Sequence, residues 1–415
     1  MDARSEVQAV VREHRGWVLA RLLRSVRDID LAEDALQLAL EAALVQWPRA
    51  GVPDHPRAWL VSAAKNRAID ELRRRTLHAE KEEEVAWLAE LTGPVPGGAP
   101  DDAPIRDDML RLVFTCCHPS LAEPSQVALT LHTIAGLETD EIARAFLVPP
   151  ATMAQRLVRA KQKIQAARVP YAVPEANELP ARRHAALGVV YLVFNEGYSA
   201  TRGDALLRRD LCRVAIGLGR ELVALMPDAA EVAGLLALML LTDARSAARR
   251  TDAGELVLLE DQDRSAWDAA QLEEGIARTR HALTLQGVGP YALQAAIAAV
   301  HSEATRAEDT DWRQIVALYD ELLRRAPTPV VALNRAVAVA MVDGPARGLV
   351  EMSALGSALD GYHLFHSARG ALLERTGDHA ASLDAYGRAL ALCQNEPEQR
   401  FLQRRIERVR ARAPG

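Results

Sequence analysis

Apolar residues recur at the spacing of an α-helix along nearly the whole chain. Alanine and leucine dominate, aromatic residues make up only 4% of the sequence, and alternating runs of β-branched residues are few. Apolar positions three or four residues apart line one face of a helix, whereas a half-buried strand needs alternate positions. The sequence therefore predicts an all-α fold without a convincing strand.

Prolines, glycines and charge divide this helical chain into parts. Its 415 residues are too many for one ordinary core. The stretch from Leu91 to Pro104 is rich in Pro, Gly and Asp, and residues 168–180 contain three prolines, so neither is expected to pack as a regular element. We expect a first domain at 1–79, an acidic Pro/Gly linker at 80–106, a second domain at 107–168, a short linker at 169–180 and a helical domain at 181–415.

The segment from Glu138 to Ile164 has the pattern of two short helices joined by a tight turn. Thr139 can cap the first helix, and Pro149-Pro150 must end it. Pro150 then fits the first turn of the second helix, where a missing N–H costs nothing. The second helix carries one apolar stripe at i, i+4, i+7 and i+11, formed by Met153, Leu157, Ala160 and Ile164. This arrangement predicts a helix-turn-helix.

The outward face of the second helix is basic, although the whole chain has a net charge of -6. Between residues 144 and 168 there are six Arg or Lys residues and no Asp or Glu. The outward side chains are Thr152, Gln155, Arg156, Arg159 and Lys163. Such a face suits phosphates and base edges in a major groove. The alternative is an amphipathic core helix with a solvated basic face, but charge and turn together favour DNA binding.

Two helices are expected in the first domain. The stretch "DIDLAEDALQLALEAALVQWP" (residues 28–48) has an apolar face and a second, polar and acidic face made of Asp30, Asp34, Gln37 and Glu41. The stretch "AWLVSAAKNRAIDELRRR" (residues 58–75) has an apolar face and ends in three arginines. An exposed acidic face of this kind indicates a binding partner. Taken separately, these features are better explained by a solvated helix face and by a basic helix end that complements the helix dipole.

Together these segments resemble a bacterial RNA polymerase sigma factor of the extracytoplasmic-function type. The Asp34-x-x-Gln37 helix, the "PRAWLVSAAKNRAIDELRRR" helix and the "GLETDEIARAFLVPPATMAQRLVRAKQKI" segment resemble its two promoter-reading domains in the right order, over roughly residues 5–168. The phrase "FTCCHPSL", followed by a long helical C-terminal part, further resembles the subgroup with a tetratricopeptide-like extension.

The resemblance implies partners and residue roles. The partners would be core RNA polymerase, through its β′ clamp and β flap, and promoter DNA. The acidic face (Asp30, Asp34, Gln37, Glu41) would lie against the clamp. The minus-ten element would be melted and held by Lys65, Asn66 and Arg67, with Trp59, Arg73, Arg74 and Arg75 along the single-strand path. The minus-thirty-five element would be read by Thr152, Gln155, Arg156 and Arg159, while Lys161 and Lys163 would touch phosphates.

The C-terminal part carries weak repeats. Residues 370–392 resemble a tetratricopeptide helix pair with Gly377 at its turn. A glycine next to an aspartate occurs at this turn and again earlier in the chain, at Gly344. We expect an α-solenoid that controls activity and offers a surface to a peptide, another domain or a ligand. The docking surface is expected in "LLEDQDRSAWD", with Asp261, Arg264 and Trp267 as contacts. The alternative is that these residues merely cap and pack.

Several classes of function are not expected. The chain shows no convergent His and carboxylate cluster of an enzyme, no cofactor motif and no metal motif, and its four cysteines form no CxxC pair. No apolar run is long enough for a bilayer and no signal-peptide pattern begins the chain, so a cytoplasmic protein without a membrane partner is expected. A helix-turn-helix regulator with a helical sensor domain, acting without polymerase, is the alternative function.

The basic outward face yields a first prediction. Arg156→Ala should weaken use of the upstream promoter element by about 1–3 kcal/mol, because the side chain is expected to read a base pair. The measurement is transcription from promoters that carry either the preferred or an altered upstream element. Unchanged transcription with the original upstream preference would remove Arg156 from the residues that read bases.

Overall fold

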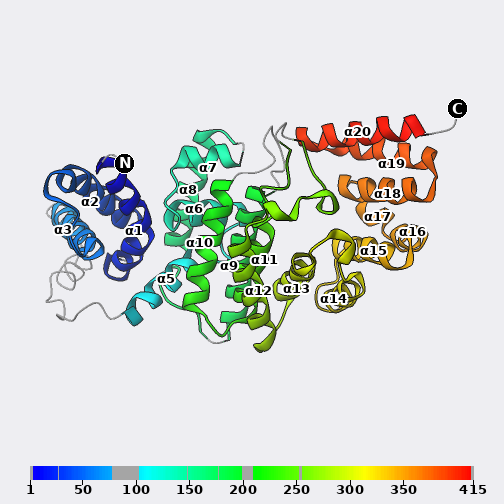
Figure 1. The fold of residues 1–415 in the computed structure, drawn as a ribbon. Helices are drawn as coiled ribbons and strands as arrows, with labels where there is room; N and C mark the ends of the chain where they lie inside the picture. Colours follow the sequence, from blue (N-terminus) through cyan, green and yellow to red (C-terminus); the bar gives the residue numbers. More distant parts are fainter. Residues whose placement is uncertain are drawn as a thin grey trace. The chain divides into compact units, whose positions relative to one another are not determined.

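The helices expected from the apolar spacing are present in the structure, a computed structural model drawn in Figure 1. It describes residues 3–26, 28–76, 102–146, 148–175, 177–198, 209–251 and 255–412. Over these residues the only β-type pairing is an isolated bridge between Arg250 and Leu256. The all-α prediction is confirmed. Within the same residues, none of the helices is both long and apolar enough to traverse a lipid bilayer.

The chain forms two units, Met1–Leu192 and Val193–Gly415, and the boundary falls within helix α9 (Leu179–Tyr198). The predicted domain boundary at residue 181 lies near the start of this helix. Most of the predicted acidic linker, residues 80–101, lies outside the described residues, and α5 (Asp102–Cys116) already begins inside its expected C-terminal end. The domain limits therefore stay predictions.

The first unit opens with three helices that pack on one another: α1 (Ala3–Val26), α2 (Ile29–Ala50) and α3 (Pro56–Thr76). The Asp28 carboxylate caps α2 by accepting from the Leu31 N–H at 3.1 Å. The expected apolar face of α2 is buried, including Leu36, Leu40, Ala43 and Trp47. This three-helix core is what presents the polar face of α2 and the basic end of α3.

A second group of helices completes the first unit: α5, α6 (Glu123–Thr133), α7 (Thr139–Ala145) and α8 (Pro150–Ala166). Helix α8 packs on α6 and α7, and α5 packs on both α6 and α1. Gly16 of α1 lies against the chain just after α6, where an added Cβ would be only 2.5 Å from the Ile134 carbonyl oxygen. Glycine at this position therefore permits close packing of α1 on the second group.

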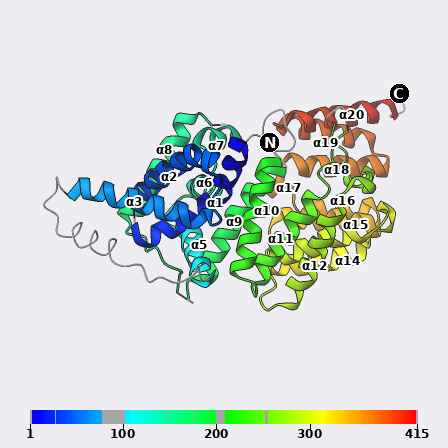
Figure 2. The same ribbon diagram turned by 60° about the vertical axis from the view of Figure 1, so that its left-hand side comes forward.

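The second unit is a series of helices, each packed chiefly on the ones next to it in sequence. They are α10 (Arg209–Leu225), α11 (Ala230–Asp243), η1 (Leu259–Asp261), η2 (Arg264–Ala266), α12 (Ala269–Thr284), α13 (Pro290–Glu303), η3 (Ala307–Asp309), α14 (Trp312–Arg325), α15 (Pro329–Asp343), α16 (Pro345–Ser353), α17 (Gly356–Leu359), α18 (His363–Thr376), α19 (His379–Leu392) and α20 (Glu396–Arg412). In Figure 2, as in Figure 1, α18, α19 and α20 lie side by side at its C-terminal end. Nearest-neighbour packing of this kind is that of an α-solenoid.

The expected turn of the tetratricopeptide-like pair is present. Gly377 ends α18 in the left-handed region (φ 82°), and the Asp378 carboxylate caps α19 by accepting from the Ala381 N–H. Gly344 lies between α15 and α16 with φ 92°. Both positions need a residue without a Cβ, which explains why glycine marked the repeat in the sequence.

Helix α11 packs on α10, α12 and α13 and is buried on all sides from Val232 to Leu241. Its Glu231 carboxylate accepts three N–H bonds, from Gly289, Tyr291 and Ala292, at the start of α13. These bonds satisfy donors that a helix N-terminus leaves unpaired, and the negative charge suits that end of the helix dipole.

Candidate nucleic-acid interface

The first helix of the predicted helix-turn-helix is α7, and it starts one residue earlier than expected. Thr139 is its first residue, so the expectation that Thr139 caps it is wrong. The cap position belongs to Glu138, whose backbone N–H donates to the Glu141 carboxylate at 2.8 Å. Because Glu141 reaches back to that N–H, half of a capping box is formed without a hydroxyl cap.

Helix α8 has the predicted start and the predicted buried stripe. Pro150 is its first residue, where the missing N–H leaves nothing unsatisfied. The buried residues are Met153, Leu157, Ala160 and Ile164, which confirms the apolar face. On the outward side Thr152, Gln155, Arg159 and Lys163 are exposed, and Arg156 is half-buried. The structure thus presents these polar side chains together on one helix face.

Lys161 on α8 is the exception among the basic residues, because it already has partners. Its ammonium group donates to the carboxylates of Glu33 and of Asp30, the latter at 3.1 Å, and both lie at the start of α2. The Lys161 side chain is only 15% exposed. Burial opposes its charge, but Glu33 and Asp30 outweigh that effect and raise the Lys161 pKa. His132 Nε2 lies 3.9 Å from the same Glu33 carboxylate.

The polar face of α2 is therefore only partly engaged. Asp30 pairs with Lys161, whereas Asp34, Gln37 and Glu41 are exposed, with the Gln37 amide 3.4 Å from the Glu41 carboxylate. The side chains of Leu38 and Val45 are also exposed on this helix, which was not predicted from the sequence. Both are apolar residues that lie off the buried apolar face of α2. An apolar residue at such a position in the helix period is the sequence signal that could have predicted their exposure. Leu38 and Val45 add exposed apolar surface to the α2 helix.

On α3 the residues expected near the minus-ten element differ in exposure. Asn66 and Arg67 are exposed and Lys65 is half-buried. Trp59 packs edge-on against Trp47, with ring centroids 5.4 Å apart, so part of its role is structural.

The basic end of α3 is partly paired within the helix. Arg73 lies 3.8 Å from Asp70, and Arg74 lies 2.6 Å from Glu71. Both pairs are solvent-accessible and weak, so DNA phosphates can compete for these arginines. Arg75 belongs to the same helix, and its side chain lies outside the described part of the chain.

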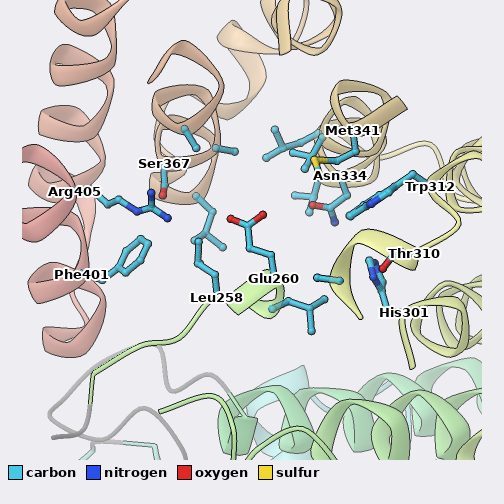
Figure 3. A pocket seen from close by; sticks show the side chains of 18 of the residues that line it. Leu258, Glu260, His301, Thr310, Trp312, Asn334, Met341, Ser367, Phe401 and Arg405 are labelled. Carbon is cyan, nitrogen blue, oxygen red and sulfur yellow. The ribbon is translucent and has the colours of Figure 1, made fainter. Parts of the chain in front are cut away.

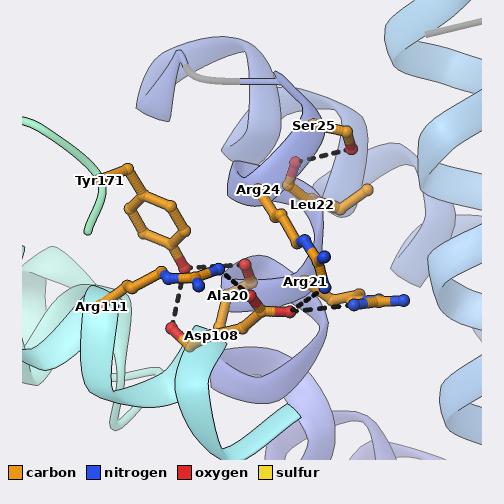
Figure 4. A network of polar contacts seen from close by, with 8 residues as sticks. All are labelled: Ala20, Arg21, Leu22, Arg24, Ser25, Asp108, Arg111 and Tyr171. Atoms are coloured by element: carbon orange, nitrogen blue, oxygen red, sulfur yellow. Dashed lines mark hydrogen bonds and ion pairs between the residues drawn. The ribbon is translucent and has the colours of Figure 1, made fainter. Parts of the chain in front are cut away.

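A buried carboxylate joins the two helical groups of the first unit (Figure 4). Asp108 on α5 is bonded to Arg21 of α1 at 3.1 Å and to Arg111 at 2.9 Å. The Tyr171 hydroxyl lies 2.7 Å from the Ala20 carbonyl oxygen and 2.9 Å from that of Asp108. Burial raises the pKa of Asp108 even though Arg21 opposes this shift. The segment after α8 is thus held at the junction of α1 and α5.

In the second unit, two of the three residues expected on a docking surface have intramolecular partners. The Arg264 guanidinium donates to the carbonyl oxygens of His301 and Ala304 and lies over the Trp267 ring, 4.7 Å from its centroid. Trp267 is buried, while Asp261 is exposed. These contacts favour a structural role for Arg264 and Trp267, and the docking surface stays a prediction.

The neighbouring acids act as helix caps. Asp263 accepts from the Ser265 N–H, and Asp268 accepts from the Gln271 N–H at the start of α12. Both caps are thus aspartates. Among the described residues, no grouping suited to a metal ion includes these aspartates.

The second unit also contains a cavity of about 800 Å³ that the sequence did not reveal. Figure 3 shows the Glu260 carboxylate pointing into it, between Arg405 on one side and Asn334 on the other. Trp312 and Phe401 contribute aromatic walls. His301 lines it too, and burial, with help from nearby arginines, lowers the His301 pKa to about 4, so this imidazole is neutral near pH 7.

Comparison with known proteins matches these parts to families. Residues 10–77 match Sigma-70 region 2, residues 111–164 match Sigma-70, region 4, and residues 182–283 match a Family of unknown function (DUF6596). An uncharacterized protein of Rhizobium meliloti (strain 1021) is 42% identical over 399 residues, which are 96% of this chain and 94% of that protein. The chain belongs to the extracytoplasmic-function group of the sigma-70 family. It is a sigma factor, and the partners of that family are RNA polymerase and promoter DNA.

A probable ECF RNA polymerase sigma factor, SigI, of Mycobacterium tuberculosis is 28% identical over 176 residues in each of two strains. This match covers 42% of the chain and 60% of SigI. In this sigma factor the region 2 and region 4 matches end at residue 164, and a helical C-terminal part follows them.

The buried network of Figure 4 generates a stability prediction. Asp108→Ala should lower the free energy of local opening of α1 and α5 by about 1–3 kcal/mol, because Arg21 and Arg111 lose charge-assisted hydrogen bonds. Native-state hydrogen exchange of these helices measures the change. The matched control is Asp70→Ala, which removes an exposed pair with Arg73 and should cost less than about 1 kcal/mol. Equal effects of the two substitutions would contradict the role given to Asp108.

Proposed function

We propose that this sigma factor binds the β′ clamp of core polymerase through the polar face of α2 and the minus-ten element through α3. In this proposal α8 reads the minus-thirty-five element, the β flap contacts the second domain, and the C-terminal helical domain controls the activity. The exposed Asp34, Gln37 and Glu41, beside exposed Leu38 and Val45, support a protein partner for α2. The exposed Thr152, Gln155 and Arg159 support duplex reading by α8.

One observation carries the regulatory part of the proposal, namely the ion pair between Lys161 and the acids Glu33 and Asp30. Lys161 is expected to touch promoter phosphates, and Asp30 is expected to touch polymerase. An ammonium group held by two carboxylates has little positive charge to offer a phosphate, and the same contact covers part of the α2 face. The contact therefore defines a closed state, which must open before both partners bind.

Control then follows from the population of the open state. A domain that binds one of two states more tightly shifts the equilibrium by its differential affinity, and each 1.4 kcal/mol changes the ratio about tenfold. The C-terminal helical domain is larger than the two promoter-reading domains together. We assign it this role, and the direction of the control is an outcome of the experiment below.

The proposed polymerase contact is tested with Asp34→Arg. The substitution should abolish co-elution with core polymerase in size-exclusion chromatography and should abolish run-off transcription, because it reverses the charge at the centre of the α2 face. Asp34 is exposed, so the fold should be kept. The matched control is Asp384→Arg, the same charge change at an exposed position of α19. A regulator that acts without polymerase would not co-elute even as the unaltered chain, and an Asp34→Arg variant with normal affinity would refute the assigned contact.

The closed state is tested with Glu33→Ala. This change removes a partner of Lys161 but none of the residues assigned to polymerase or DNA, so promoter affinity should rise, by about tenfold for each 1.4 kcal/mol of closed-state contact that is lost. Transcription from one cognate promoter at matched protein levels gives the readout. Lys163→Ala serves as the comparison, because Lys163 is exposed, has no ion pair with α2 in the structure and should only lose affinity.

A truncation after Tyr198, the end of α9, tests control by the C-terminal domain, because it keeps the bond from Arg182 to the Phe114 carbonyl oxygen. If the domain acts through the closed contact, the effects of the truncation and of Glu33→Ala on transcription should not be additive. Equal output from truncated and full-length protein would exclude control in cis.

A further inference from the structure

Three side chains with metal-binding chemistry meet at the C-terminal end of the solenoid. They are His363, the first residue of α18, Cys393, which follows α19, and Glu398, in the first turn of α20. The His363 Nε2 atom lies 2.9 Å from Glu398 Oε2, and Cys393 Sγ lies 3.7 Å from the same oxygen. All three donor atoms lie within 4.8 Å of one another.

These separations are close to those of a tetrahedral metal site. With Zn–N, Zn–O and Zn–S bonds of about 2.0–2.3 Å, neighbouring ligands of Zn²⁺ are roughly 3.3–3.8 Å apart. The Cys393–Glu398 distance already falls in this range, and the His363–Glu398 distance is slightly shorter. Small side-chain rotations would admit the ion. A thiolate, a carboxylate and a neutral imidazole would also balance its two positive charges.

The surroundings hold the three ligands in place. Cys393 is buried and packs in a cluster with Tyr386 and Leu402. The chain between Cys393 and α20 is fixed by two bonds: the Asn395 side-chain oxygen accepts from the Glu398 N–H, and the Gln399 amide donates to the Cys393 carbonyl oxygen. His363 and Glu398 are half-buried, so both side chains are accessible to water. Supporting bonds of this kind orient the ligands of known metal sites.

We propose that His363, Cys393 and Glu398 bind one Zn²⁺ ion, with water as the fourth ligand. The ion would join α18, the end of α19 and the start of α20. At its other end α20 is held by Arg408 and Arg412, which pair with Glu374 of α18. Zinc would thus hold the first turn of α20, whose last turns are already held by the ion pairs with Glu374. This inference does not depend on the proposed function.

The same three groups form a hydrogen-bonded set without a metal, so the experiment must separate the two cases. Full-length protein without a polyhistidine tag is stripped with a chelator and dialysed against Zn²⁺, and its metal content is measured by mass spectrometry. Competition with a chromophoric chelator gives the affinity. We expect one Zn²⁺ per chain, slower hydrogen exchange in the first turns of α20, and for Co²⁺-loaded protein a thiolate-to-cobalt charge-transfer band.

Matched variants assign the ligands. Cys393→Ser should lose the charge-transfer band and at least about tenfold in affinity. Cys212→Ser, at another buried free cysteine of the same unit, should bind as the unaltered chain does. Glu398→Gln keeps the size of the side chain and an acceptor for His363 but loses the anionic ligand, so it should also weaken binding with an unchanged circular-dichroism spectrum. Absence of stoichiometric zinc, or a band that survives Cys393→Ser, would show a hydrogen-bonded cluster only and overturn the proposal.

Discussion

The ion pair between Lys161 and the acids Glu33 and Asp30 joins the two surfaces that we propose to bind polymerase and promoter DNA. One partner belongs to the helix expected on duplex DNA, and the others belong to the helix expected on polymerase. Charges that attract nucleic acid and polymerase from solvent also attract each other within the chain. A partner that binds the separated surfaces more tightly than the paired ones would shift the equilibrium towards the open contact, so the pair can act as a reversible contact.

The buried Asp108 network is a second polar contact between the two helical groups of the first unit. Because Asp108 bonds both Arg21 and Arg111, and Tyr171 lies against two backbone carbonyls, α1, α5 and the segment after α8 share one polar junction. A buried carboxylate that lost these partners would cost free energy, so the junction favours one arrangement of the first unit. It differs in this respect from the exposed pairs at the end of α3.

The second unit is organised by neighbour contacts rather than by one central core. Glu231 ties α11 to the start of α13, and Glu374 ties α18 to the end of α20. The cavity that contains Glu260 arises where segments far apart in the sequence meet, whereas the cluster of His363, Cys393 and Glu398 arises where the consecutive helices α18, α19 and α20 meet. A solenoid exposes such junctions along its length, which is why this part of the molecule offers more than one candidate site.

The sequence by itself determined the local elements and the family: the buried stripe of α8, Pro150 at its start and Gly377 at the turn before α19 follow from spacing and backbone chemistry. Only the tertiary structure decided which charges pair, because Lys161 and Glu33 look equally free along the chain. It also decided that Trp267 is buried, that Glu138 takes the cap position expected for Thr139, and that His363 meets Cys393 and Glu398. The physical reason is range: helix periodicity and turn chemistry act over a few residues, whereas burial and ion pairing depend on which helices pack together.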